Sequence, residues 1–185
     1  GPPVSRADAA PPSSPDARPP DPAADGACAL ASLHLVDPAA TDRLGEALAG
    51  RLDGGDTVLL SGPIGAGKSH LARATIQALY RHAGLTAPEV PSPTYTLVQG
   101  YEAGRVAIVH ADLYRLGDAS ELAELGLTDA FGQDLCLVEW PDRLGPLAPP
   151  DALRLDLRAC GAGRRATLLG PGRWAARLAG LAAEV

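Results

Sequence analysis

The sequence predicts an α/β protein in which helices cover a central β-sheet. A glycine-rich stretch at 62–69 lies between a short apolar run at 57–61 and a helical spacing of apolar residues at 69–82. Further apolar runs at 106–110 and 135–138 have the length and composition of buried strands. Strands that alternate with helices in this way are typical of a sheet covered by helices.

The segments before the glycine-rich stretch come first. Residues 30–36 alternate weakly between polar and apolar, which predicts an edge strand. Residues 39–52 place their apolar side chains on one face, so we expect a helix there, capped by Asp37 or Thr41. A glycine pair then turns the chain into the strand at 57–61.

Two strand pairs are expected after the helix at 69–82. The β-prone run that follows Pro93 and ends at Tyr101 is separated by a short turn from the strand at 106–110, and the two predict a hairpin. Residues 153–157 and 165–169 would pair across a glycine-rich turn, and 135–138 predicts a separate buried strand.

Two helices complete the expected domain. Asp118 or Ser120 can cap a helix that runs to about Leu125, and residues 172–183 predict a closing helix. We interpret 30–185 as a single domain. Residues 1–29 hold eight prolines and eight alanines without apolar periodicity, so we expect a disordered arm.

The composition limits the class of protein. A net charge of −6 argues against binding nucleic acid through bulk charge, although a partner could still provide that contact. The three cysteines are odd in number and lack C-x-x-C spacing, which favours a reduced, cytoplasmic protein. No apolar run approaches the ~18–20 residues that span a membrane, and the chain does not open on a signal peptide. We expect no membrane association.

Residues 62–69 match G-x-x-x-x-G-K-[ST], the phosphate-binding loop (P-loop) of nucleotide hydrolases and kinases. Its glycines let backbone N–H groups close around phosphate oxygens, and the next helix adds the positive end of its dipole. We expect Lys68, the only lysine in the chain, on the β- and γ-phosphates and the Ser69 hydroxyl on Mg²⁺. The nucleotide-binding residues expected in and beside the loop are Gly62, Gly65, Ala66, Gly67, Lys68, Ser69 and His70.

Two carboxylates are expected to face this loop. Asp112 follows the strand at 106–110, and Glu139 directly follows the strand at 135–138. Ligands of open α/β sheets gather at such strand ends, and a neighbouring carboxylate holds Mg²⁺ directly or through water. We expect one of the two on the metal and the other on a water molecule; an ordinary solvated strand end is the alternative for each.

Thr94 is a candidate for sensing the γ-phosphate, because its segment leads into the hairpin that ends at Asp112. A threonine in a turn is an equal alternative. His110 and Trp140 are more often structural residues in such positions. The arginine pair at 164–165 lies on a glycine-rich turn, either on the surface or within reach of the nucleotide.

Four motifs in order resemble the bacterial TsaE family, also called YjeE. They are the P-loop at 62–69, Ser-Pro-Thr-Tyr-Thr-Leu-Val at 92–98, His-Ala-Asp-Leu-Tyr-Arg-Leu at 110–116 and Val-Glu-Trp-Pro at 138–141. The P-loop alone indicates only a nucleotide, whereas the other three together are specific to the family. The resemblance covers roughly residues 35–170.

The resemblance implies a P-loop NTPase-like, three-layer fold with a mixed, partly antiparallel central sheet. It implies ATP and Mg²⁺ as cofactors, slow hydrolysis, and the TsaD and TsaB proteins as partners. In the family, TsaD with TsaB transfers a threonylcarbamoyl group to adenosine 37 of tRNA. ATP binding and hydrolysis by TsaE would reset or activate that complex, so tRNA is reached only indirectly.

The resemblance also assigns residues. The family's metal-binding hydroxyl falls on Ser69, where threonine is usual, and the swap keeps the oxygen. Its acidic residues fall on Asp112 and Glu139, its tryptophan on Trp140 and its switch threonine on Thr94. The implied catalytic set is therefore Lys68, Asp112, Glu139 and Thr94, and the implied metal set is Ser69, Glu139 and Asp112.

Adenine contacts in the family come from the segment before the first helix and from the C-terminal part. Here this suggests residues 37–41, with Thr41, and Arg164 or Arg165. Trp140 is expected to contact the nucleotide as well.

Three other functions compete with this interpretation. A GTPase usually carries Asn-Lys-x-Asp, but this chain has no asparagine and its one lysine is already in the P-loop. A small-molecule kinase would need a lid, and no arginine-rich lid helix is evident. The third candidate is a nucleotide-dependent binding module without useful turnover, which is close to what the family implies. Measurement of phosphate release would distinguish such a module from an ATPase.

Overall fold

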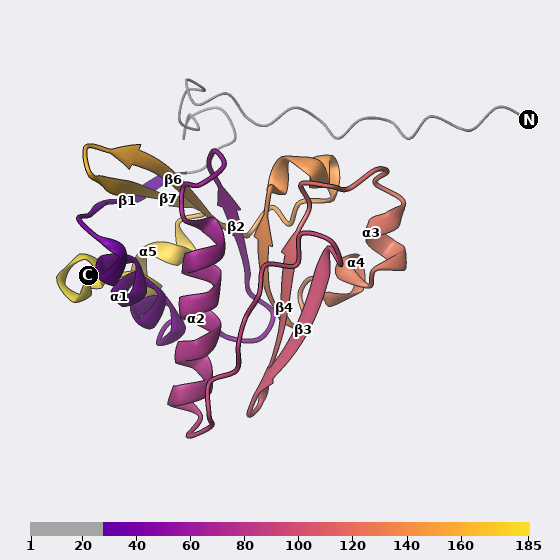
Figure 1. Ribbon diagram of the computed structural model, residues 1–185, viewed down its shortest axis with the longest axis horizontal. Helices are drawn as coiled ribbons and strands as arrows, with labels where there is room; N and C mark the ends of the chain where they lie inside the picture. The colour runs from indigo at the N-terminus through magenta and orange to yellow at the C-terminus, as the bar shows by residue number, and fades with distance from the viewer. Residues whose placement is uncertain (1–27) are drawn as a thin grey trace, which may run out of the picture.

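The computed structural model describes residues 28–185, which form one mixed seven-stranded sheet in the order β1-β7-β6-β2-β5-β4-β3, with helices around it (Figure 1). The strands are β1 (Cys28–Leu35), β2 (Thr57–Ser61), β3 (Val98–Ala103), β4 (Val106–Asp112), β5 (Leu135–Glu139), β6 (Leu153–Cys160) and β7 (Gly163–Gly170). The α-helices are α1 (Pro38–Ala49), α2 (Lys68–His82), α3 (Glu121–Glu124), α4 (Leu127–Ala130) and α5 (Arg173–Arg177), and η1 (Pro141–Leu147) and η2 (Leu181–Glu184) are 3-10 helices.

The sheet is parallel in its centre and antiparallel towards its edges. Strands β6, β2, β5 and β4 run parallel to one another. Strand β3 pairs antiparallel with β4, while β7 pairs antiparallel with both β6 and β1. The short turns before β4 and β7 allow only antiparallel pairing. The predicted mixed, partly antiparallel sheet is confirmed.

Side chains of the central strands alternate between two cores, as the two-residue period of a strand requires. Val58 and Leu60 of β2 pack in one core with α1 and α2, whereas Leu59 packs in the other with α3 and α4. Figure 1 shows α2 lengthwise beside β2, and α3 with α4 on the far side of β4. The three-layer α/β fold is therefore confirmed.

Helix α1 begins as the sequence predicts. Asp37 is its N-cap, and its Oδ1 accepts a hydrogen bond of 2.8 Å from the N–H of Ala40. Pro38 occupies the first turn, where its missing N–H is harmless. The other predicted cap, Thr41, is a buried residue inside the helix.

The predicted single closing helix at 172–183 is wrong. The structure has α5 and η2 instead, separated at Gly180, whose φ of 76° lies in the left-handed region. Trp174 of α5 is fully buried, and its Nε1 donates to the carbonyl oxygen of Asp151 at 2.9 Å. The segment therefore packs Trp174 into the core and does not continue as one helix.

Strand β1 begins at Cys28, so residues 28 and 29 belong to the sheet rather than to the predicted arm. Residues 1–27 lie outside the described residues, and their disorder stays a prediction. Of the helices in the described part of the chain, none has the length and apolar character needed to cross a membrane.

Candidate functional site

The P-loop runs from β2 to α2 at the carboxyl end of the parallel strands. Gly62 and Gly67 have φ values of 138° and 102°, which favour glycine. A Cβ atom on Gly62 would lie 2.2 Å from the carbonyl oxygen of Leu157 in β6. The loop packs so closely on the neighbouring strand that only glycine fits at its first position.

We expect the strained backbone conformation alone to lower the free energy of unfolding of Gly62→Ala by ~1–3 kcal/mol. The contact with Leu157 adds to this loss. Thermal unfolding measures it, and Gly65→Ala is the matched control, because Gly65 has a φ of 77° and no atom within 4 Å of an added Cβ. Equal melting temperatures for the two variants would contradict the close packing.

Lys68 brings a buried positive charge to the loop. Its side chain is 5% exposed, and Nζ donates to the carbonyl oxygens of Gly62 at 2.5 Å and Pro63 at 2.9 Å. Burial lowers the pKa of Lys68, and the carboxylates of Glu139 and Asp112 oppose this shift. The ammonium group has lost most of its water, so an anion in front of it would be strongly favoured.

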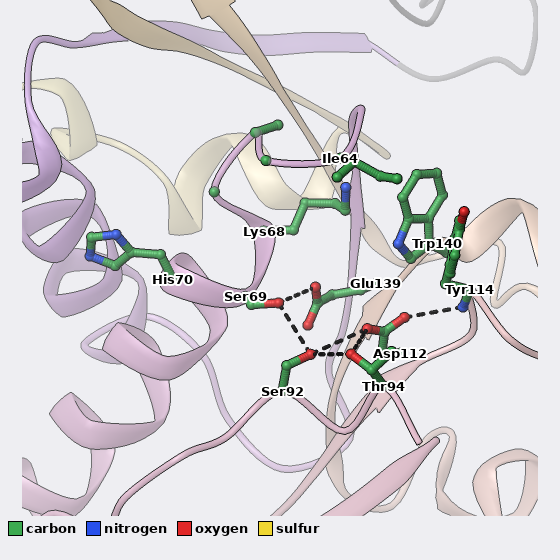
Figure 2. A pocket seen from close by; sticks show the side chains of 13 residues that line it. Ile64, Lys68, Ser69, His70, Ser92, Thr94, Asp112, Tyr114, Glu139 and Trp140 are labelled. Carbon is green, nitrogen blue, oxygen red and sulfur yellow. Dashed lines mark hydrogen bonds between the residues drawn. The ribbon is translucent and has the colours of Figure 1, made fainter. Parts of the chain in front are cut away.

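Trp140 covers this lysine. Lys68 Nζ lies 4.1 Å from the centre of the Trp140 ring, and the Tyr114 ring packs on the tryptophan at a centroid distance of 5.0 Å (Figure 2). Trp140 itself has a φ of 57°, which is uncommon for a residue with a side chain. The strained turn after β5 therefore places the ring over the lysine.

The two predicted carboxylates lie on neighbouring strands, directly opposite each other. Asp112 of β4 pairs with Glu139 of β5 in the parallel ladder, and both are buried, at 5% and 2% exposed. The Ser69 hydroxyl donates to Glu139 Oε1 at 2.7 Å. The structure thus brings Ser69, Glu139 and Asp112 together beside Lys68.

Asp112 is held by the segment that precedes β3. Its Oδ2 accepts hydrogen bonds from Thr94 Oγ1 at 3.2 Å and Ser92 Oγ at 3.3 Å, and its Oδ1 accepts one from the N–H of Tyr114 at 3.1 Å (Figure 2). Ser92 Oγ also lies 2.9 Å from Thr94 Oγ1 and 3.5 Å from Ser69 Oγ. A chain of hydroxyls therefore links the P-loop to Asp112.

These groups line a cavity of about 410 Å³ at this edge of the sheet. Its lining residues are Ile64, Gly65, Ala66, Gly67, Lys68, Ser69, His70, Ser92, Thr94, Asp112, Tyr114, Glu139 and Trp140. His70, which also lines the cavity, has its Nε2 2.6 Å from Oδ1 of Asp42 in α1.

Three of the predicted nucleotide contacts, Gly62, Arg165 and Thr41, do not line this cavity. Arg165 donates from Nη1 to Ser32 Oγ at 2.9 Å, while its neighbour Arg164 donates to the carbonyl oxygens of Gly65 and Ala66 at 3.2 and 3.1 Å. Adjacent residues of β7 face opposite sides, so only one of the pair can meet the P-loop. Thr41, buried within α1, does not line the cavity either.

Three contributions were missed in the sequence. Ser92 and Tyr114 line the cavity, and His110, interpreted as structural, has Nε2 2.6 Å from Glu139 Oε2. Ser92 carried a signal, since it opens the same motif as Thr94, and Tyr114 follows Asp112 in the motif that begins at His110.

The donor atoms around Ser69 suit a small, hard cation. Two carboxylates and a hydroxyl are present, and no group of three or more His, Cys, Asp or Glu in the described residues could hold a metal alone. Mg²⁺ is commonly bound by one or two carboxylates together with phosphate oxygens of a substrate. The residues therefore fit Mg²⁺ that arrives with a nucleotide.

Comparisons with known proteins identify the family to which the chain is similar. The model of the family described as "Threonylcarbamoyl adenosine biosynthesis protein TsaE" matches residues 35–166. The tRNA threonylcarbamoyladenosine biosynthesis protein TsaE of Rickettsia conorii is 37% identical over 119 residues, which are 64% of this chain and 66% of that protein. The protein of the same name from Haemophilus influenzae is 45% identical over 87 residues, 46% of this chain and 52% of that protein.

A solved structure is similar across most of the fold. The crystal structure of Bacillus subtilis YdiB superposes with a TM-score of 0.65 at 26% identity, covering 82% of this chain and 93% of that one. The family match extends from the end of β1 into β7 and includes the P-loop, Asp112, Glu139 and Trp140. The chain therefore belongs to the TsaE family.

Proposed function

We propose that the protein is a Mg²⁺-dependent ATPase of the system that makes threonylcarbamoyladenosine in tRNA. The observation that carries this proposal is the Ser69 hydroxyl on the Glu139 carboxylate, 2.7 Å apart, beside the buried Lys68. A buried ammonium group next to a hydroxyl and carboxylates suits a nucleotide phosphate with its metal ion. The relatives' names place them in threonylcarbamoyladenosine biosynthesis.

Each group has a role in this proposal. Lys68 would contact the β- and γ-phosphates, and Ser69 with Glu139 would hold Mg²⁺. The metal ion would supply positive charge that stabilises the negative charge developing during phosphoryl transfer. Asp112, which is fixed by three hydrogen bonds from Thr94, Ser92 and Tyr114, orients the attacking water.

The partners follow from the family. We propose that ATP binding and hydrolysis reset or activate a TsaD–TsaB transferase, and that this protein reaches tRNA only through that complex in the cytoplasm. A net charge of −6 supports indirect rather than direct contact with tRNA. The proposed nucleotide is ATP rather than GTP, because proteins usually recognise guanine through an Asn-Lys-x-Asp motif and this chain has no asparagine.

The test has a biochemical and a cellular part. We expect phosphate release from ATP by the purified chain, alone and with TsaD and TsaB, to require Mg²⁺ and to exceed release from GTP. In a strain depleted of its own TsaE, this chain should restore threonylcarbamoyladenosine in tRNA. Tight ATP-dependent partner binding without any phosphate release would show a binding module instead of an ATPase, and failure to restore the modification would contradict the pathway.

Thr94 is proposed to report the γ-phosphate to the partners. Its hydroxyl bonds both Ser92 and Asp112, so a change at the phosphate would move the exposed segment around Tyr95. We expect the TsaD–TsaB complex to bind more tightly with ATP than with ADP. Thr94→Ala should reduce that difference by ~1–3 kcal/mol, a usual coupling free energy.

Affinity for the partner complex with ATP, with ADP and without nucleotide measures this coupling. Thr96→Ala is the matched control, because Thr96 is exposed in the same segment and does not line the cavity. Equal affinities in all three nucleotide states would rule out the switch and leave the ATP site unaffected.

A further inference from the structure

His110 lies where it can act on the proposed metal ligand Glu139. It precedes Asp112 by two residues in β4, so both side chains leave the same face of the sheet. Across the ladder His110 pairs with Leu137, and Glu139 is its diagonal neighbour on β5, within reach of a long side chain. His110 is 0% exposed. It is therefore a buried polar side chain aimed at a buried carboxylate.

The contact between them has a defined direction. His110 Nε2 lies 2.6 Å from Glu139 Oε2, and an ionised carboxylate only accepts, so Nε2–H is the donor. The other oxygen, Oε1, accepts from Ser69. Each oxygen of Glu139 thus has its own donor, one from the sheet and one from the P-loop. His110 Nδ1 has no hydrogen-bond partner among the described residues, so the ring makes this single polar contact.

We propose that His110 is a positioning residue that fixes the Glu139 carboxylate with Oε1 towards Ser69 and the metal. This inference rests on the proposed function and names a residue that supports it. Asp112 lies directly opposite Glu139 in the ladder, and two neighbouring carboxylates repel each other. Without the His110 N–H, Oε2 of Glu139 would be a buried oxygen with no hydrogen-bond donor. Rotation of the carboxylate towards another partner would relieve that cost and would move Oε1 away from Ser69.

The chemistry of amide side chains gives a discriminating set of variants. Glutamine places an amide N–H near the position of Nε2, whereas asparagine places one near Nδ1, which has no partner here. Leucine fills a similar volume and donates nothing. His82→Leu is the matched control, because His82 Nε2 also contacts a glutamate, Glu46, but at an exposed site away from the cavity.

The experiment measures binding of a non-hydrolysable ATP analogue to the full chain as Mg²⁺ is titrated, together with kcat and KM for ATP. Loss of a group that orients a metal ligand typically costs about 10–100-fold in metal affinity or activity. We expect a change of this size in the Mg²⁺ half-saturation or kcat for His110→Leu and His110→Asn. His110→Gln should stay close to wild type, because its amide N–H replaces the lost donor, and analogue affinity without Mg²⁺ should be unchanged in all three.

The outcomes separate the inference from the proposed function. If the wild-type chain shows no Mg²⁺-dependent binding or hydrolysis of ATP, the proposed function fails and the inference fails with it. If the wild type is active and His110→Leu and His110→Asn match it, only the positioning role is overturned. Should the leucine variant not fold, the glutamine and asparagine variants decide, and equal behaviour of those two overturns the proposal.

Discussion

Lys68→Ala is expected to abolish detectable ATP binding and hydrolysis while the fold persists. Among the described residues that line the cavity, Lys68 is the sole lysine or arginine, so no other strong cation there can face the phosphates. Its burial makes the charge more effective than an exposed one, because little water screens it. Removal of one hydrogen-bond donor that stabilises charge in the transition state typically lowers the rate by about 10²–10³-fold. In Lys68→Ala the main positive charge that would bind the phosphates is lost as well.

Isothermal titration with ATP and a phosphate-release assay measure the effect. Arg73→Ala is the control, because Arg73 is an exposed residue of the same helix and does not line the cavity. Thermal unfolding should show that the variant still folds, although the carbonyl oxygens of Gly62 and Pro63 lose their donor. Unchanged ATP affinity and hydrolysis in Lys68→Ala would end the P-loop assignment.

Glu139→Gln and Asp112→Asn are each expected to reduce hydrolysis by roughly 10²-fold or more, the scale of a positioned catalytic group. Both changes keep the shape of the side chain and remove its charge. Glu139 would lose its charge beside Ser69, and Asp112 would lose its strength as an acceptor for Thr94 and Ser92. Nucleotide binding should weaken less than hydrolysis, because the P-loop and Lys68 remain.

Single-turnover hydrolysis measures the chemical step apart from binding. Asp156→Asn is a control for removing a buried acid, since Asp156 is 2% exposed and bonds Ser61 outside the cavity lining. A structure with nucleotide gives a second check, because a carboxylate more than about 8 Å from the metal cannot orient its ligands or water. Wild-type hydrolysis by both variants would remove the proposed metal and water roles.

The sequence predicts the centre of this site well because the signals there are local. A P-loop needs its glycines, lysine and hydroxyl within eight consecutive positions, and these lie at 62–69. A second local pattern, a charged residue that ends an apolar run, predicts Asp112 and Glu139. Because β4 and β5 are neighbouring parallel strands, their carboxyl ends lie side by side, which places Asp112 next to Glu139.

Other features depend on relations that a single segment does not contain. The register between β7 and β6 decides which of the two arginines at 164–165 faces the P-loop. The sequence of β7 alone does not contain that register. The contact of His110 with Glu139 is a diagonal between neighbouring strands and joins two residues that are 29 positions apart in the chain. Helix α4 is only four residues long, too short for a periodic pattern to predict.

The pairing of Asp112 with Glu139 has a consequence for insertions and deletions in this chain. The separation of the two carboxylates is set by the β4–β5 ladder rather than by a loop, so added residues in the turn at Gly104 should leave it intact. One extra residue within β4 would act differently, because a shift of one position exchanges the two faces of a strand. His110 and Asp112 would then point into the core beneath α3 and α4, and Ala111 would stand opposite Glu139. Natural or engineered length variation can therefore be accommodated in the turns of this domain but not within the strand that carries its acids.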